Sequence, residues 1–320
     1  MENYKDIVFA QRFIKRFSGK SKFYISKNFQ ALGLSRQTIQ NKIENLREKK
    51  VIHNITINIH PYSKPNNLKF VFLEVKTNPT EPQLVDELLR IPHLKMLDGI
   101  FGEFSLIALF VFNTPKEYYQ VLEKIDSVMA NSYFKKYHII ETIRVFKTNG
   151  IKIDEARTDT EITLDNNDHL ILKILQEEQD IKPISTYNIR DKMKDQYCIE
   201  LSQSTIHNRI KRLERKGIIL NYAINFSPKK IGFEGKFILR MKPKDTSKYN
   251  GIALKLEKSQ FITDLFRIGE ENGLFAIVRV KKVEDYAKFI KNLYESEDIE
   301  DTRTNFVLDE LKPYTNFKTF

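Results

Sequence analysis

Apolar residues recur with a helical period in two stretches of the chain. In each stretch a serine precedes three apolar residues spaced at i, i+4 and i+7, which places those residues on one face of a helix. The residues are Ser35, Ile39, Ile43 and Leu46 in the first stretch and Ser202, Ile206, Ile210 and Leu213 in the second. Serine is a preferred N-cap residue, so the pattern predicts two amphipathic helices that begin at the serines.

The two stretches belong to a long internal repeat. Residues 35–47 align with residues 202–214 without a gap, and the same offset continues as far as Pro61 and Pro228. Self-similarity over such a length indicates duplicated structural units. We therefore predict that the chain is a tandem duplication of a unit of about 150 residues.

The first part of each unit is predicted to be helical and to end in a short β hairpin. The helices that precede the two serines are expected at residues 6–17, 22–31, 168–178 and 185–194. Apolar residues then alternate from Ile55 to Ile59 and from Tyr222 to Phe226, which is typical of a strand. Three helices followed by a hairpin wing form a winged helix-turn-helix, and this fold is predicted over residues 1–62 and 164–228.

The second part of each unit alternates strands and helices in the order βαββαβ. In the first copy the strands are expected at residues 69–76, 95–101, 104–112 and 137–146 and the helices at 83–91 and 115–129, and the second copy repeats this order over 233–308. The order predicts a ferredoxin-like (ACT/RAM-like) domain over residues 66–148 and 231–315, with a linker at 149–163, and therefore an α+β protein. Phe70 and Val71 point to opposite faces of their strand, so we expect the face without helices to pack on the sheet of the other copy.

Positive charge is concentrated in one part of the chain. The 320 residues carry a formal net charge of +11. Residues 1–62 contain 12 lysines and arginines against 4 acidic residues, whereas residues 164–228 contain 10 against 9. A general need for solubility would spread the excess evenly. Its concentration favours contact with a polyanion, and double-stranded DNA is the expected partner.

Other features of the composition narrow the class of function. The longest purely apolar run, residues 106–112, is far shorter than the about 18 residues of a membrane span, and residues 1–6 are too polar to begin a secretory signal. We therefore expect a cytoplasmic protein with no membrane partner. The six histidines have no metal-ligand spacing, and the one cysteine cannot form an internal disulfide. Neither a metal nor a cofactor is expected.

The polar face of each N-capped helix carries residues that are suited to reading DNA bases. Arginine pairs bidentately with guanine, and asparagine and glutamine pair with adenine. The candidate base-reading residues are Arg36, Gln37, Gln40 and Asn41 in the first copy and Gln203, Ser204, His207 and Asn208 in the second. The candidate phosphate contacts are Lys27, Thr38, Lys42, Arg47, Thr205, Arg209 and Arg212. A polar helix face is most often only solvated, but its place in a helix-turn-helix favours DNA binding.

Residues 164–175 and 201–219 resemble the Lrp/AsnC (feast/famine) transcription regulators, and residues 221–225 and 231–233 extend the likeness. The resemblance implies a DNA-binding winged helix joined to a ligand-sensing, oligomerising module, here fused into a single-chain pseudo-dimer that we expect to form a homodimer. It also implies an amino-acid-like effector beside two loops, where the candidates are Gly102, Ser105, Gly269 and Asn272. The aspartate of the family's Gly-x-x-Asp pattern is absent from both loops, so no particular effector is indicated.

Two alternatives to a sequence-specific regulator remain open. One is an architectural protein that binds DNA without sequence preference. The other is an enzyme, because the siroheme decarboxylases resemble the same domain pair, with degraded reading helices and a pocket rich in histidine, arginine and aromatic residues. This chain has intact reading helices, no tryptophan and no set of nucleophile and base, so we expect that it is not an enzyme.

Overall fold

The chain forms two compact units, each of which combines segments from both halves of the sequence. The computed structural model describes residues 2–17, 35–62, 68–153, 164–313 and 315–317. Unit one consists of residues 1–65, 154–232 and 315–320, and unit two consists of residues 66–153 and 233–314. The domains predicted as separate stretches of sequence are thus brought together by type, the helix-turn-helix segments in one unit and the βαββαβ segments in the other.

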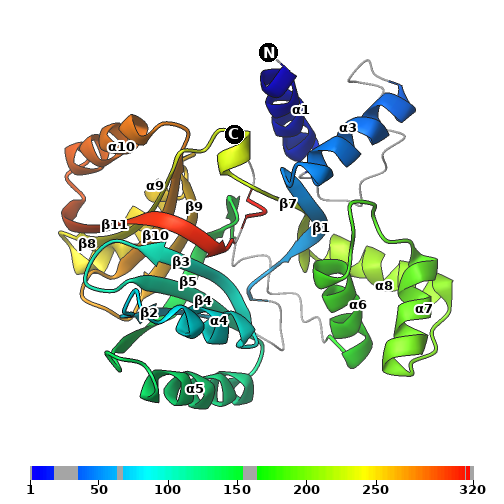
Figure 1. Cartoon of the computed structure of the whole chain (residues 1–320), viewed down its shortest axis with the longest axis horizontal. Coiled ribbons are helices and arrows are strands. Elements are labelled where there is room, and N and C mark those ends of the chain that lie inside the picture. Colours follow the sequence, from blue (N-terminus) through cyan, green and yellow to red (C-terminus); the bar gives the residue numbers. More distant parts are fainter. Residues whose placement is uncertain (1, 18–34, 63–67, 154–163, 314, 318–320) are drawn as a thin grey trace. The chain divides into compact units, whose positions relative to one another are not determined.

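Unit one contains the predicted reading helices (Figure 1). Its helices are α1 (Glu2–Phe17), α3 (Arg36–Glu48), α6 (Asn166–Glu177), α7 (Thr186–Tyr197), α8 (Gln203–Arg215) and the short 3-10 helix η3 (Lys229–Ile231). The hydroxyls of Ser35 and Ser202 accept hydrogen bonds of 3.1 Å from the backbone N–H groups of Thr38 and Thr205, so both serines act as N-caps. The helix predicted at residues 22–31 lies outside the described residues.

The predicted hairpin wings are a correction, because each half supplies one strand and the two strands pair with each other. Strand β1 (Ile52–Ile59) runs antiparallel to β7 (Ile219–Phe226), and the two lie side by side in Figure 1. In the described part of unit one no return strand follows either of them. A single strand leaves its backbone groups unpaired, and pairing across the two halves satisfies these groups. Alternation along the sequence identifies a strand but does not identify its partner.

Unit two contains two successive βαββαβ segments, and the chain has the mixed α+β character that the sequence predicts. The first segment comprises β2 (Lys69–Val75), α4 (Pro82–Arg90), β3 (Leu94–Ile100), β4 (Leu106–Phe112), α5 (Pro115–Ala130), β5 (Tyr137–Thr148) and the short β6 (Ile151–Lys152). The second comprises β8 (Gly235–Pro243), η4 (Thr246–Lys248), α9 (Tyr249–Leu256), β9 (Ile262–Ile268), β10 (Leu274–Val280), α10 (Val283–Glu295) and β11 (Ile299–Lys312).

The strands of unit two form one sheet that closes on itself. The strand order is β5–β2–β4–β3 in the first segment and β11–β8–β10–β9 in the second. Strand β3 pairs with β11, and β9 pairs with β5, so the edges of one segment's sheet join the edges of the other. The packing expected between the two copies thus exists within one chain, and it includes backbone pairing at both edges.

Alternate residues of each strand face different cores, as the sequence pattern requires. Val71 and Leu73 of β2 belong to a cluster that includes Leu84 of α4 and Ile125 of α5. Their neighbour Phe72 faces the other way, and its ring centroid lies 4.1 Å from that of Phe275 on β10. The apolar groups on both faces of β2 are therefore buried, one against the helices and the other between the two halves of the closed sheet.

Candidate DNA-reading helices and effector loops

Helix α3 presents amide side chains to solvent at the predicted base-reading positions. Gln37 and Asn41 are exposed, and the Gln37 amide donates a 2.9 Å hydrogen bond to Asn41 Oδ1. Gln40 is half-buried, and Arg36 is the first residue of the helix. The buried stripe of this helix consists of Ile39, Ile43 and Leu46, as its spacing predicts. The polar face of α3 is thus available to a partner.

The predicted phosphate contacts of the first half lie at the flanks of that face. The Lys42 ammonium lies 5.3 Å from the centroid of the Phe9 ring on α1. Arg47 is exposed and forms ion pairs with Glu44 at 3.6 Å and with Asp180 at 3.3 Å. The hydroxyl of Thr38 contacts that of the capping Ser35 at 2.8 Å. Lys27 lies outside the described residues.

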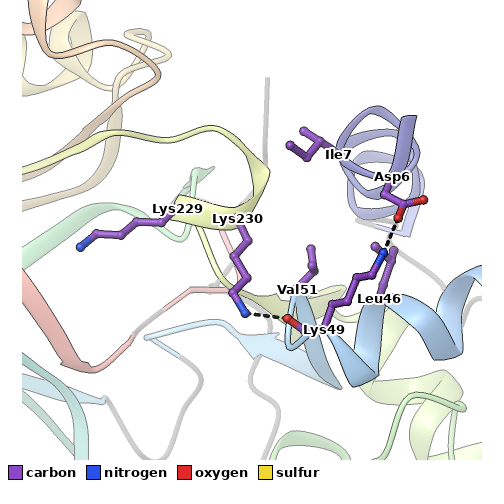
Figure 2. Close-up of a pocket in the computed structure, with 7 residues that line it drawn as sticks. All are labelled: Asp6, Ile7, Leu46, Lys49, Val51, Lys229 and Lys230. Atoms are coloured by element: carbon purple, nitrogen blue, oxygen red, sulfur yellow. Dashed lines mark hydrogen bonds and ion pairs between the residues drawn. The ribbon is translucent and has the colours of Figure 1, made fainter. Parts of the chain in front are cut away.

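Asp6 holds the C-terminal end of α3 against α1. Its carboxylate accepts hydrogen bonds of 2.7 Å from Lys49 Nζ and 3.3 Å from the Asn45 amide. The bond from Lys49 keeps the pKa of Asp6 below its usual value. Figure 2 shows this pair beside Lys230, whose ammonium donates to the backbone carbonyl of Lys49. These residues, with Lys229, line a pocket of about 350 Å³.

Helix α8 presents a different set of side chains at the equivalent positions. His207 and Asn208 are exposed. The Gln203 amide is half-buried and donates a 2.9 Å hydrogen bond to Thr186 Oγ1 of α7. The Ser204 hydroxyl lies 2.8 Å from the hydroxyl of Ser202, the N-cap residue of α8. The base-reading face of the second half is therefore partly engaged by its own surroundings.

Two of the predicted phosphate contacts in the second half are instead ion pairs within the protein. Arg209 donates to the Asp165 carboxylate at 2.7 Å and to Asp168 at 2.9 Å, and Arg212 also binds Asp168. The Asp168 side chain is 0% exposed. The prediction failed here because a helical wheel cannot show that the N-terminus of α6 lies beside α8. Thr205 is half-buried, and its hydroxyl lies 2.8 Å from that of Ser202.

These contacts also order the charges of the second half. Burial raises the pKa of the Asp165 carboxyl, but the hydrogen bonds from the Asp168 backbone and from Arg209 outweigh it, and the pKa stays below its usual value. Burial lowers the pKa of Arg209, but the bonds to the two carboxylates outweigh it and raise the pKa. Both groups are therefore held in their charged forms.

The effector-loop candidates lie in two connections of unit two, between β3 and β4 and between β9 and β10. Ser105 Oγ lies 3.3 Å from both the backbone N–H and the carbonyl of Thr77. Gly102 has a φ of +149°, and a Cβ there would lie 2.7 Å from the Asn305 amide nitrogen. Gly269 donates its N–H to the Glu141 carbonyl at 3.1 Å, and Asn272 is buried.

The two loops converge on a polar cluster that the sequence did not predict. Arg240 binds Glu74 and donates to Asn305 Oδ1 at 3.2 Å, and its Nε lies 3.9 Å from Glu270 of the second loop. His138 lies 3.3 Å from Glu74 and 3.0 Å from Glu270. Asn305 in turn donates to the carbonyl of Phe101, just before Gly102. The available signal was a charged residue at an inward position of an otherwise apolar strand, which is costly to bury unless it is paired.

A second set of charged residues is buried between the two halves of the closed sheet. Lys236 lies 2.6 Å from Asp98 and 3.3 Å from Glu310, and Arg279 lies 2.6 Å from Glu310. Burial raises the pKa of Asp98 despite Lys236, whereas the attraction of Arg279 and Lys236 outweighs burial at Glu310 and holds its pKa well below the usual value. The two cations and two carboxylates compensate one another, so this set closes the interior and offers no charge to a ligand.

Two further searches concern only the part of the chain that the structure describes. No group of three or more histidine, cysteine, aspartate or glutamate side chains is arranged to hold a metal ion in those residues. None of the helices in those residues is both long enough and apolar enough to cross a bilayer.

The comparisons with known proteins agree with the helix-turn-helix character of unit one. The chain is 29% identical over 152 residues to the HTH-type transcriptional regulator FL11 of Pyrococcus furiosus, covering 48% of this chain and 94% of that protein. It is 31% identical over 113 residues to the HTH-type transcriptional regulator Ptr1 of Methanocaldococcus jannaschii, covering 35% of this chain and 76% of that protein. These relatives define the class as HTH-type transcriptional regulators.

The family follows from the second kind of unit. A sequence profile described as the Lrp/AsnC ligand binding domain matches residues 237–317, which include most of the second βαββαβ segment. Together with the regulators above, this match shows that the chain belongs to the Lrp/AsnC family.

The expectation that the chain is not an enzyme is contradicted. The crystal structure of the siroheme decarboxylase NirDL matches 98% of this chain and 94% of its own chain, with a TM-score of 0.60 and 12% sequence identity. At this identity the likeness shows the fold alone. An enzyme therefore has the same whole-chain architecture, and neither intact reading helices nor the absence of tryptophan excludes that class.

Proposed function

We propose that the chain is a sequence-specific DNA-binding transcription regulator that works as a single-chain pseudo-dimer and acts in the cytoplasm. One observation carries the proposal. Two serine-capped helices, α3 and α8, expose Asn41 and Asn208 at equivalent positions of a unit whose relatives are HTH-type regulators. Asparagine pairs bidentately with adenine in the major groove, so both helices are suited to base readout. We assign Gln37, Gln40 and His207 to the same task and exclude Arg209 and Arg212 from the phosphate contacts.

The test is a binding measurement on DNA selected from random duplexes by the full-length protein. The double variant Asn41→Ala/Asn208→Ala should lose at least tenfold in affinity for the selected duplex and retain its affinity for random duplexes. The matched control is Asn292→Ala, which removes an exposed asparagine from helix α10 of unit two. Equal affinity of the double variant and the control for the selected duplex would reject the assignment. A protein that enriches no sequence at all would instead be an architectural DNA-binding protein.

We further propose that a small molecule, such as an amino acid, binds where the loops after β3 and β9 approach Arg240. The support is that both sets of effector candidates lie beside one polar cluster with acidic and basic side chains. Calorimetric titration with each of the twenty amino acids tests this site, with Glu270→Gln as the variant. Binding that is unchanged in the variant would place the effector elsewhere.

The proposed pseudo-dimer also makes a prediction about assembly. The βαββαβ segments pair at both edges within one chain, which supports a duplicated unit that needs no second chain to complete its sheet. We expect further association into a homodimer with four helix-turn-helix elements. Light scattering at low micromolar concentration measures this, and a mass of 37.8 kDa would reject the homodimer.

A second candidate function is enzymatic, and the whole-chain match to siroheme decarboxylase NirDL is the observation that favours it. A structure of that enzyme in complex with an iron-uroporphyrin III analogue has a TM-score of 0.59 to this chain. Absorbance titration of the purified chain with iron-uroporphyrin tests this candidate directly. A saturable spectral change at one equivalent would favour the enzyme, and its absence would favour the regulator.

A further inference from the structure

The two halves of unit one are related by a pseudo-twofold axis at the β1–β7 ladder. Thr56 and Ala223 are directly opposite each other, and they are also equivalent residues of the internal repeat. A residue that pairs with its own equivalent lies on a twofold axis, as at an isologous dimer interface. The axis therefore passes between these two residues.

Asparagine side chains beside this axis follow the same symmetry. Asn58 donates a 2.8 Å hydrogen bond to Asn221 Oδ1, and Asn225 donates a 2.9 Å hydrogen bond to Asn54 Oδ1. Asn58 and Asn225 are equivalent in the repeat, and so are Asn221 and Asn54. Each bond is the symmetry mate of the other. The axis is thus supported by side chains as well as by backbone register, and it relates helix α3 to helix α8.

The surfaces that this axis relates are not alike. At the candidate base-reading positions, Arg36, Gln37 and Gln40 correspond to Gln203, Ser204 and His207. Only the fourth position carries the same residue in both halves, as Asn41 and Asn208. Residue type decides which base is preferred, because arginine selects guanine and glutamine selects adenine. The two helices therefore present different donor and acceptor patterns.

The hydrogen bonds on the two faces differ as well. In α3 the Gln37 amide is paired with Asn41, so two amide groups are held side by side on the surface. In α8 the Gln203 amide is turned to Thr186 of the neighbouring helix, and Ser204 is turned to its N-cap residue. Fewer side chains of α8 are free to read bases. The half-site read by α3 should accordingly be the more sharply defined.

We propose that the operator of this regulator is not a palindrome but consists of two unlike half-sites, which the protein binds in one fixed orientation. This inference rests on the proposed function and extends it. Symmetric homodimers read pseudo-palindromes because their two reading helices are identical. Here the pseudo-twofold axis keeps the geometry of such a dimer while the reading residues differ. Reversing the protein on its site would place each helix on the wrong half-site.

The experiment selects duplexes from a random library with the full-length protein and with a symmetrised variant. The variant Gln203→Arg/Ser204→Gln/His207→Gln copies the reading residues of α3 onto α8. The wild type should enrich two different half-sites, of which the α3 half-site is better defined, and should prefer this duplex at least tenfold over a palindrome built from either half. The symmetrised variant should reverse this preference and favour the palindrome of the α3 half-site.

A reciprocal variant and a stability measurement keep the test decisive. Arg36→Gln/Gln37→Ser/Gln40→His should favour the palindrome of the other half-site, and both variants should unfold at the wild-type temperature because they change reading-face residues only. A palindrome enriched by the wild type would overturn the inference and leave the proposed function intact. Duplexes without any common sequence would overturn the proposed function itself, and the inference with it.

Discussion

The two helix-turn-helix halves of unit one stabilise equivalent helices in different ways. In the first half, Asp6 binds Lys49, whose side chain is 51% exposed, at the end of α3. In the second half, the fully buried carboxylate of Asp168 binds Arg209 and Arg212 in the middle of α8. The second half thus uses its cations internally, and its net charge is small, whereas the first half keeps most of its positive charge on the outside. Equivalent positions in a repeat need not do the same work.

The largest difference should appear in stability. Replacing Asp168 by Asn leaves two guanidiniums without their buried partner and should cost about 3 kcal/mol of unfolding free energy. Asp6→Asn removes a pair that is largely solvated and should cost less than about 1 kcal/mol. Urea denaturation of both variants measures the two costs. Equal losses would mean that the two anchors are energetically equivalent, contrary to their burial.

The next difference concerns base readout at the first position of each reading helix. We expect Arg36→Ala to weaken binding to the selected duplex by about 1–3 kcal/mol and to relax the preference at one base pair. The equivalent Gln203→Ala should cost less, because Gln203 is already bonded to Thr186. Fluorescence anisotropy on one labelled duplex compares them. A larger loss for Gln203→Ala would assign the main reading role to α8.

Salt dependence should separate Lys42 from its equivalent, Arg209. Lys42→Gln removes a cation at the flank of the reading face, so the slope of log affinity against log salt should fall by about 1. Arg209→Gln should leave this slope unchanged, because Arg209 is paired with Asp165 and Asp168. Titrations between low and moderate salt give both slopes. An equal decrease in the two variants would restore Arg209 to the phosphate contacts.

The smallest expected effect is the pH dependence that arises from Asp165. Its pKa is lower in the folded protein than in the unfolded chain, so its contribution to stability is complete above the unfolded value of about 4 and is lost as the pH falls towards the folded value. Asp165→Asn removes this contribution. The variant should therefore lose less stability than the wild type between pH 6 and pH 3. Parallel pH profiles of the two proteins would show that Asp165 does not contribute.

The sequence predicted local elements well because their causes are local. The caps at Ser35 and Ser202 and the buried stripe of α8 depend on residues a few positions apart. The partner of a strand is decided by residues far away in the sequence. The period of β1 could not reveal that β7, and not a hairpin return, would satisfy its backbone.

The candidate site shows the same division between local and distant causes. The exposed faces of α3 and α8 follow from helical periodicity, and the structure leaves Asn41 and Asn208 exposed, as expected. The role of Arg209 depends on Asp165 and Asp168, more than forty residues earlier. The cluster around Arg240 depends on contacts with Glu74, which lies 166 residues away in the chain. Periodicity contains no information about such pairs.

The pairing of β3 with β11 has a consequence for synthesis of the chain. About 200 residues separate the two strands, and at translation rates of about 5–20 residues per second the ribosome needs roughly 10 to 40 s to pass from one to the other. During this interval the emerged strands β2–β5 have two edges without their final partners, and unpaired edges invite pairing with other chains. Nascent chains of this protein therefore depend on protection by chaperones until the second half has emerged.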